Sequence, residues 1–198
     1  MSPLYASGSA IALWGLSWMI AAIWTRRTQA RPSPLDQAPY LIPTVIGVGL
    51  LYSDIAMRLR PRFAWVGGDE LWRLPAAAGW LLFGVGLVGL AFTWWARLTL
   101  GDLWSGHVTR KEGHRVVQSG PYRLVRHPIY TGLILAFAAF ALQLASPAAF
   151  AGVALIAFGF WLKARLEERF LGQQLGEGAY ADYRRRTPML VPFWPTKR

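Results

Sequence analysis

The chain contains no cysteine and no asparagine, and charged residues make up only 16% of its 198 residues. Without cysteine there can be no disulfide, thiolate nucleophile, zinc–thiolate site or iron–sulfur cluster. Acidic residues are scarce as well, at 10 against 21 lysines and arginines. Such an excess of positive charge can indicate nucleic-acid binding, but here the basic residues lie between long apolar runs. We therefore expect no nucleic-acid partner.

Long uncharged runs are what the chain does contain. Hydrophobic residues make up 54% of it and the mean hydropathy is +0.29, which argues against an ordinary soluble domain. A hydrocarbon core of about 30 Å requires about 20 helical residues. Runs of that length cover 4–24 and 74–96, which carry no charge, and 38–57, whose single charge is Asp54. These three runs predict three membrane-spanning helices.

A fourth apolar block, 129–162, has 34 residues without a charge and carries Ser146-Pro147 at its middle. One helix of that length would exceed the core, and proline suits the first turn of a new helix. We therefore predict two antiparallel helices over 129–145 and 147–166. The predicted fold class is all-α integral membrane, with five transmembrane helices of which the last two form a hairpin.

The basic residues predict the orientation. A five-helix path brings 26–31, 97–128 and 163–198 to one face, and these segments hold 17 of the 21 lysines and arginines. That face should be cytoplasmic, although the loop 58–73 adds four arginines to the other face. We expect one membrane domain over 1–198. Its N-terminal helices would occupy 1–73 and its core 74–198, with the functional loop and the C-terminus in the cytoplasm. With 18 arginines against 3 lysines and no asparagine, the gene is predicted to be bacterial and the membrane to be the inner membrane.

Two polar segments, 97–128 and 167–198, are longer than a helical bundle needs for its connections, which indicates a functional role. The densest stretch runs from Gly120 to Gly132. Its Gly-Pro pair favours a turn, and Arg126-His127-Pro128 stands at the start of the fourth apolar block. An arginine at a helix N-terminus can bind an anion. Arg126 and His127 could equally be interfacial side chains that reach toward water.

Acidic residues stand at the end of the fifth apolar run. Lys163 and Glu167 are four residues apart and Arg165 and Glu168 three apart, so each pair shares a helical face. The ordinary interpretation is a ladder of surface ion pairs. The functional interpretation is a carboxylate beside the membrane that binds a cationic ligand.

The stretch His114-Arg-Val-Val-Gln-Ser-Gly-Pro-Tyr-Arg-Leu-Val-Arg-His-Pro-Ile-Tyr-Thr-Gly, followed by Glu167-Glu168 and Tyr180-Ala-Asp-Tyr183, resembles the isoprenylcysteine carboxyl methyltransferase family of integral-membrane enzymes. Phospholipid N-methyltransferases are close relatives of that family. The resemblance covers roughly 97–195 and implies S-adenosylmethionine as methyl donor, with no metal. The residues it implies for cofactor binding are Arg110, His114, Arg115, Val116, Val117, Tyr122, His127, Pro128, Ile129, Tyr130, Glu167 and Glu168.

For catalysis the resemblance implies Glu168 and an arginine one turn before it. The matching position holds Ala164, and of its two neighbours, Lys163 and Arg165, we favour Arg165. The family's phospholipid enzymes also carry a Gly-x-Gly similar to Gly84-Val85-Gly86. Because glycine is common in membrane helices, we expect those two glycines to serve helix packing.

The methyl acceptor stays open. It could be an isoprenylcysteine-like carboxylate, another lipid-associated molecule that enters from the bilayer, or a small molecule from the cytoplasm. A carboxylate is ionised at neutral pH and needs no base, whereas an amine would make Glu167 or His127 a candidate base. Three alternatives remain: a phospholipid or amine N-methyltransferase, an NADPH-dependent sterol-type reductase, and a non-catalytic membrane protein. Against the reductase, Ile129 stands where those enzymes have asparagine.

Overall fold

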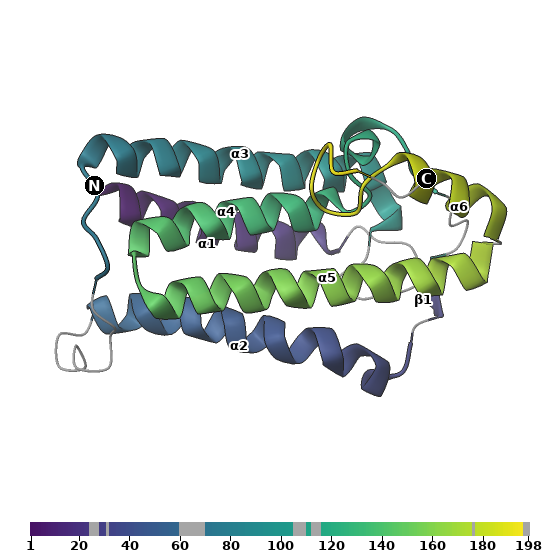
Figure 1. Ribbon diagram of the computed structural model, residues 1–198, viewed down its shortest axis with the longest axis horizontal. Helices are drawn as coiled ribbons and strands as arrows, with labels where there is room; N and C mark the ends of the chain where they lie inside the picture. Colours follow the sequence, from purple (N-terminus) through teal and green to yellow (C-terminus); the bar gives the residue numbers. More distant parts are fainter. Residues whose placement is uncertain are drawn as a thin grey trace.

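The computed structural model describes residues 1–23, 28–30, 32–59, 70–104, 110–111, 116–175 and 177–195. Within these ranges the chain forms long helices joined by short irregular segments (Figure 1). The α-helices are α1 (Pro3–Ala21), α2 (Pro34–Leu59), α3 (Ala76–Leu100), α4 (Pro128–Leu144), α5 (Pro147–Leu175) and α6 (Glu177–Arg186); the shorter elements are the 3-10 helices η2 (Gly101–Leu103) and η3 (Gly120–Arg123) and the strands β1 (Thr28–Ala30) and β2 (Arg110–Lys111).

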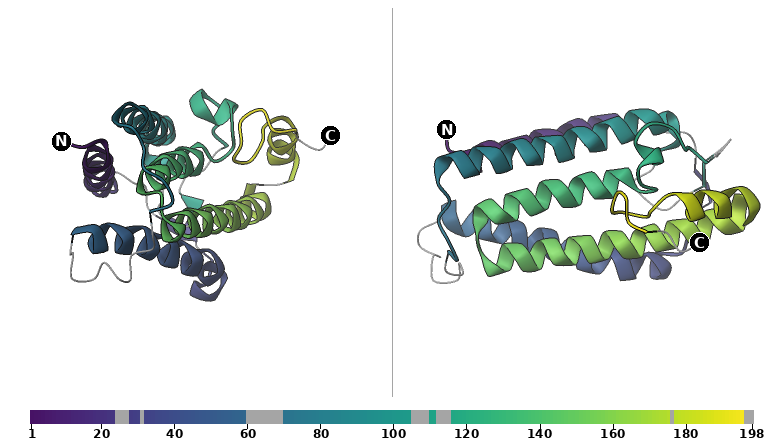
Figure 2. Two further views of the ribbon diagram at one scale, coloured as in Figure 1. Left: turned by 60° about the vertical axis from the view of Figure 1, so that its left-hand side comes forward. Right: turned by 45° about the horizontal axis from the view of Figure 1, so that its top comes forward.

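The first five α-helices run side by side along the long axis of the molecule. Figures 1 and 2 show α4 and α5 in the middle, with α1 and α3 packed against α4, and α2 packed against α5. Successive helices run in opposite directions. As a result η3, α6 and the C-terminal residues gather at one end of the bundle, and the α4–α5 junction lies at the other.

The all-helical architecture predicted from the apolar runs is confirmed. By length and composition, three helical stretches in the described part of the chain could cross a membrane: Pro3–Ala21, Ala76–Leu103 and Pro147–Phe170. Helix α4 is apolar too but has only 17 residues. Large apolar side chains on α1 and α3 point outward, among them Met19, Leu81 and Val88, which are 71%, 70% and 64% exposed. Such surfaces suit lipid rather than water.

The predicted break between the last two long helices is also confirmed. Helix α4 ends at Leu144, Ala145 adopts a left-handed conformation with φ 50°, and α5 begins at Pro147. The Ser146 hydroxyl accepts a hydrogen bond from the Ala149 amide at 3.1 Å and so caps the new helix. Helix α5 continues to Leu175, beyond the predicted end at 166, which brings its acidic residues within reach of α6.

Helices α3 and α4 touch backbone to backbone at a pair of glycines. A Cβ added to Gly89 would lie 2.6 Å from the Gly132 carbonyl oxygen, and one added to Gly132 would lie 2.5 Å from the Gly89 carbonyl oxygen. The packing role that we expected for Gly84 and Gly86 is wrong. In the part of the chain that the structure describes, a Cβ at either position would meet nothing within 4 Å. The glycine that makes the close contact between α3 and α4 is Gly89, one turn after Gly86.

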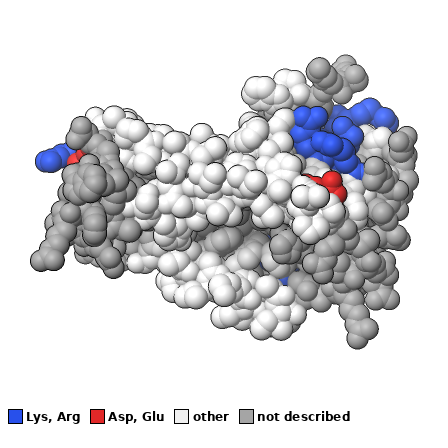
Figure 3. All heavy atoms as spheres, turned by 90° about the horizontal axis from the view of Figure 1, so that it is seen from below, with Lys and Arg blue, Asp and Glu red and all other residues white. Residues whose placement is uncertain are grey.

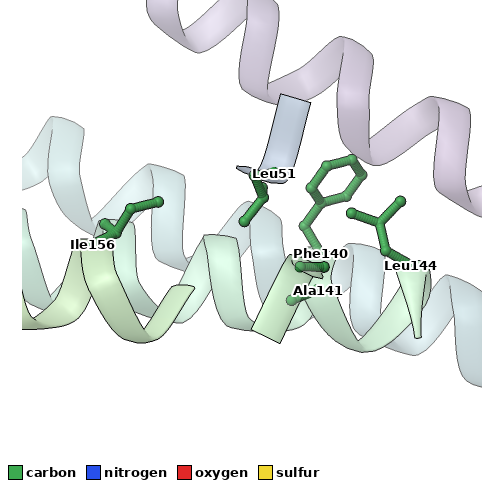
Figure 4. Close-up of a cluster of buried hydrophobic side chains, with 6 residues drawn as sticks. Leu51, Phe140, Ala141, Leu144 and Ile156 are labelled. Carbon is green, nitrogen blue, oxygen red and sulfur yellow. The ribbon is translucent and has the colours of Figure 1, made fainter. Parts of the chain in front are cut away.

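A buried apolar cluster holds α2, α4 and α5 together at the end that carries the hairpin junction (Figure 4). Its fully packed members include Leu51 of α2, Phe140 and Leu144 of α4, and Ile156 of α5. Each is at most 3% exposed. The sequence did not indicate the short antiparallel pair between β1 and β2, which joins the segment after α1 to the segment after η2.

Candidate functional site

The polar end of the bundle carries the charged groups. Figure 3 shows lysines and arginines gathered at this end, whereas the long middle of the visible face is almost free of charge. Two local features place the start of α4 here. Gly120 adopts φ 57°, a left-handed conformation that glycine tolerates, and so starts η3. Pro128 then opens α4 directly after His127, which stands at the N-cap position.

Glu168 of α5 is the centre of the site. Its side chain is only 5% exposed and its Oε1 accepts a hydrogen bond from Arg126 Nε at 2.7 Å. The same oxygen lies 3.2 Å from His127 Nε2. On the other carboxylate oxygen, Oε2, Arg184 of α6 approaches to 3.5 Å with its Nε. A buried carboxylate of this kind is held by charge-assisted hydrogen bonds from two other segments of the chain.

Glu167 lies beside it and faces the same imidazole from the other side. Its Oε2 lies 3.3 Å from His127 Nδ1, and its Oε1 accepts a hydrogen bond from the Tyr130 hydroxyl at 2.6 Å. The His127 ring is therefore placed between two carboxylates. It also stacks on Tyr130, whose ring stacks in turn on Phe160. We call Arg126, His127, Glu167 and Glu168 the α4–α5 charge cluster.

The two carboxylates set the protonation of His127. Burial disfavours the charged imidazolium, but hydrogen bonds and negative charge from Glu167 and Glu168 outweigh it and raise the pKa of His127 above its ordinary value of 6.5. The ring consequently keeps its second proton over a wider pH range than a free histidine does. Held in this way, His127 is better suited to donate hydrogen bonds than to accept a proton from a substrate.

Lys163 brings α2 into the site. Its Nζ lies 5.3 Å from the centre of the Tyr130 ring and 5.5 Å from the centre of the Tyr40 ring. Tyr40 belongs to α2, is 3% exposed and donates a hydrogen bond to Gln37 Oε1. Cation–π contacts with the two rings stabilise the Lys163 ammonium, and so does the negative charge of Glu167 one turn later on the helix.

The residues after α6 close over the charge cluster. We call residues 187–195 the C-terminal strap. Arg126 Nη1 donates to the carbonyl oxygens of Arg184, at 3.1 Å, and of Thr187. The backbone amides of Arg126 and His127 donate to the carbonyls of Pro188, at 2.9 Å, and Met189, at 3.1 Å. The strap therefore holds the turn that precedes α4.

Two tyrosines tie η3 to α6. The Tyr183 hydroxyl donates to the Tyr122 carbonyl at 2.7 Å, and both rings are buried. Burial raises the pKa of Tyr122 and that of Tyr183, so both phenols stay protonated. This contact brings the predicted cofactor residue Tyr122 to the same end of the bundle as Glu168.

The structure brings together only some of the predicted site residues. His127, Tyr130, Glu167 and Glu168 meet in one place. Pro128 is buried behind them, and Ile129 packs on the core formed by Leu90, Leu133 and Ala136. Val116 and Val117 are half-buried. The side chains of Arg110, His114 and Arg115 lie outside the described residues.

Arg165 lies away from the cluster. It is exposed, and its guanidinium carbon lies 4.8 Å from the centre of the Trp161 ring on the same helix. The expected pairing of Arg165 with Glu168 is not found, because Glu168 turns toward Arg126 and His127. The arginine that binds Glu168 is Arg126, which the sequence analysis did not assign to the cofactor site. Its position directly before His127-Pro128, at the start of α4, could have indicated this role. For Lys163 the signal was its spacing of four residues from Glu167.

A sequence profile of the isoprenylcysteine carboxyl methyltransferase family matches residues 81–173, which include both halves of the charge cluster. A methanethiol S-methyltransferase of Mycobacterium tuberculosis is 31% identical over 191 residues, covering 87% of this chain and 68% of that protein. The chain belongs to the isoprenylcysteine carboxyl methyltransferase family.

Two further relatives match a shorter region. Methanethiol S-methyltransferase 2 of Bradyrhizobium diazoefficiens is 34% identical over 135 residues, which cover 62% of this chain and 49% of that protein. The cobalt-zinc-cadmium resistance protein CzcN of Cupriavidus metallidurans is 35% identical over 127 residues, which cover 63% of this chain and 53% of that protein. This member of the family thus spans about half the length of these two relatives.

Proposed function

We propose that this protein is a membrane methyltransferase that uses S-adenosylmethionine as its methyl donor. The observation that carries the proposal is the buried α4–α5 charge cluster, which lies within the region that matches the family. Buried charges are costly and are kept where a site needs them. Family membership then favours methyl transfer as the reaction that this cluster serves.

The chemistry of the cluster fits the donor. S-adenosylmethionine supplies a methyl group bound to a cationic sulfonium, and it also carries an amino group, a carboxylate and an adenine. Among the described residues, Glu168 Oε2 faces only Arg184, a half-exposed side chain at 3.5 Å. We therefore assign Glu168 Oε2 as the group that binds the amino group of the donor. Once the donor has displaced Arg184 from Glu168, the Arg184 guanidinium can bind the carboxylate of the donor.

The rest of the cluster orients Glu168. Arg126 and His127 hold Oε1, and the strap holds Arg126 through the carbonyls of Thr187 and Pro188. These contacts leave Glu168 little freedom to rotate, which favours alignment of reactants. Tyr122, His114, Arg115, Val116, Val117 and Arg110 remain our predictions for the wall of the cofactor pocket, and Arg165 remains our prediction for an acceptor contact.

For the acceptor we favour a group that is anionic when it reacts. His127 holds its proton between two carboxylates, so it is a poor general base for removing a proton from an amine. A carboxylate, of the isoprenylcysteine kind or from a small molecule, needs no base. A thiol, which the names of two relatives suggest, would have to react as its thiolate. Both acceptors suit this site better than a phospholipid amine.

We infer that all five long helices cross the membrane. They run antiparallel, and the polar end carries most of the basic residues, which favours a cytoplasmic position for that end and for the C-terminus. If the gene is bacterial, the membrane is the inner membrane. A lipid-linked acceptor would then enter between α3, α4 and α5 from the bilayer, and a soluble one from the cytoplasm.

The proposal is tested by thermal-shift titration of the detergent-purified protein with S-adenosylhomocysteine, in parallel with NADPH. A ligand that binds the folded state raises the unfolding temperature. We expect stabilisation by S-adenosylhomocysteine alone. Stabilisation by NADPH alone would overturn the proposal in favour of a sterol-type reductase, and no response to either would favour a non-catalytic membrane protein.

Variants then locate the cofactor. We expect Glu168→Ala and His127→Ala each to weaken S-adenosylhomocysteine binding about tenfold or more, which corresponds to about 1.4 kcal/mol. Arg165→Ala is the matched control. It removes an exposed charge three residues from Glu168, so cofactor affinity should be unchanged even if turnover falls. Unchanged affinity in the first two variants would remove them from the cofactor site.

A further inference from the structure

The C-terminal strap crosses the start of α4 and then exposes an apolar tip. Beyond the bonds to Pro188 and Met189, the Thr131 hydroxyl donates to the Leu190 carbonyl at 2.6 Å. Thr131 lies one turn inside α4. The strap has therefore run from the polar end of the bundle down to the first apolar turn of a helix, as Figures 1 and 2 show for the yellow C-terminal loop.

At this level the chain turns back. The Trp194 amide donates to the Val191 carbonyl at 3.2 Å, and Phe193 has φ 62°, a conformation rare for an aromatic residue. This turn leaves Val191 55%, Phe193 90% and Trp194 66% exposed. Large aromatic side chains held outward on an ordered turn need a partner that is apolar at one end and polar at the other.

The surroundings of the tip indicate what that partner is. On one side lies the apolar helix α4. On the other lies α6, whose last turn carries Arg184, Arg185 and Arg186. Tryptophan and phenylalanine beside a row of arginines match a bilayer surface, where aromatic rings occupy the headgroup level and basic residues meet anionic lipids.

We propose that Val191, Phe193 and Trp194 insert into the cytoplasmic headgroup region of the bilayer and anchor the strap there. The proposal rests on the membrane placement inferred above and goes beyond the methyltransferase function. Because the same strap binds Arg126 and His127 through the carbonyls of Pro188 and Met189, the lipid contact also stabilises the α4–α5 charge cluster. The strap is thus a positioning element that joins the site to the membrane surface.

The absence of cysteine allows a direct test by single-site spin labelling. Phe193→Cys carries the label at the tip. Val88→Cys, on the outward face of α3, is the lipid-embedded control, and Gln118→Cys, at an exposed position in the polar segment before η3, is the aqueous control. Each labelled protein is reconstituted into phosphatidylcholine–phosphatidylglycerol vesicles. Collisions of the label with oxygen, which concentrates in lipid, are compared with collisions with a water-soluble nickel chelate.

We expect the ratio of oxygen to nickel accessibility at position 193 to lie several-fold above that at 118 and to approach that at 88. A ratio at 193 equal to that at 118, with 88 embedded, would overturn the lipid anchor alone. A nickel-accessible label at 88 would overturn the membrane placement itself and with it the proposed function of a membrane enzyme.

A second measurement tests the link to the site. In vesicles, the double variant Phe193→Ser, Trp194→Ser should exchange the amide hydrogens of Arg126 and His127 faster than the wild type, because their acceptors lie in the strap. Val88→Ser on α3 is the control and should leave those two amides unchanged. Equal exchange in the double variant and the wild type would show that lipid contact does not hold the strap on the site.

Discussion

Arg126 and Arg165 are both arginines close to Glu168 in space or in sequence, but their surroundings differ. The Arg126 side chain is 8% exposed and meets a buried carboxylate, whereas Arg165 is exposed and stacks on Trp161. A buried ion pair costs desolvation of both charges, and loss of one partner leaves the other charge buried without compensation. The two positions therefore allow a matched comparison.

We predict that Arg126→Ala destabilises the protein far more than Arg165→Ala. The loss of the Arg126 guanidinium would leave the buried Glu168 with only His127 and Arg184, which should cost up to roughly 3–5 kcal/mol. Removing an exposed arginine over an aromatic ring should cost about 0.5–1 kcal/mol. Thermal unfolding of both variants in the same detergent checks this. Equal shifts in unfolding temperature would contradict the assignment of Arg126 to a buried ion pair.

His127 should make the stability depend on pH. Its pKa in the folded protein is raised above 6.5, so the folded state binds the proton more tightly than the unfolded state. The stabilisation is fully present below about pH 6.5 and is lost as the pH rises through the folded-state pKa of His127. We expect the difference in unfolding temperature between the wild type and His127→Gln to shrink over that range. A difference that grows with pH would be the opposite of this prediction.

Helices α3 and α4 depend on the contact between Gly89 and Gly132. An added methyl at Gly89 would meet the Gly132 carbonyl oxygen at 2.6 Å, a distance that forces the helices apart. In a membrane, where apolar side chains gain little from leaving lipid, such close backbone packing contributes much of the association between helices.

We therefore predict that Gly89→Ala lowers the unfolding temperature clearly. Gly86→Ala, one turn earlier on α3, has no described atom within 4 Å of its Cβ and serves as the control. It should be neutral or slightly stabilising, since alanine favours helix over glycine by about 1 kcal/mol. Comparable losses in the two variants would mean that glycine matters for backbone flexibility and not for the α3–α4 contact.

The antiparallel course of five long helices puts the two ends of the chain at opposite ends of the bundle (Figure 1). The C-terminal end lies with the basic residues and with the charge cluster. The loop 58–73, with four arginines, opposes this orientation by charge alone. The larger number of basic residues at the other end decides the orientation we infer.

Reporter fusions test this orientation in bacterial cells. Alkaline phosphatase fused after residue 198 should be inactive, because it is active only outside the cytoplasm, and a fluorescent protein at the same position should fluoresce. Fusion of the phosphatase in the loop 58–73 should give activity. An active phosphatase at the C-terminus would reverse the orientation, and the same result at both positions would contradict an odd number of crossings between them.

The sequence by itself determined the helical elements and indicated the segment that carries the candidate site. Long apolar runs predicted the helices, and Ser146-Pro147 predicted the break between α4 and α5, because the length of an apolar run and the missing amide of proline are properties of the local sequence. The motif from Gly120 to Gly132 indicated the correct family and correctly placed His127 at the start of a helix. Its neighbour Arg126 was noted but was not assigned to the site.

Only the tertiary structure decided which charges meet. Spacing predicted that Lys163 pairs with Glu167 and Arg165 with Glu168. Lys163 does lie near Glu167, but packing of α5 against α4 turns Glu168 toward His127 and leaves Arg165 outside. Spacing along one helix sets which side chains are neighbours. The rotation of that helix against its partners, which distant residues determine, sets which face is buried. The contact of α2 with Lys163 and the hydrogen bonds between the strap and α4 also depend on distant residues, so the sequence did not predict them.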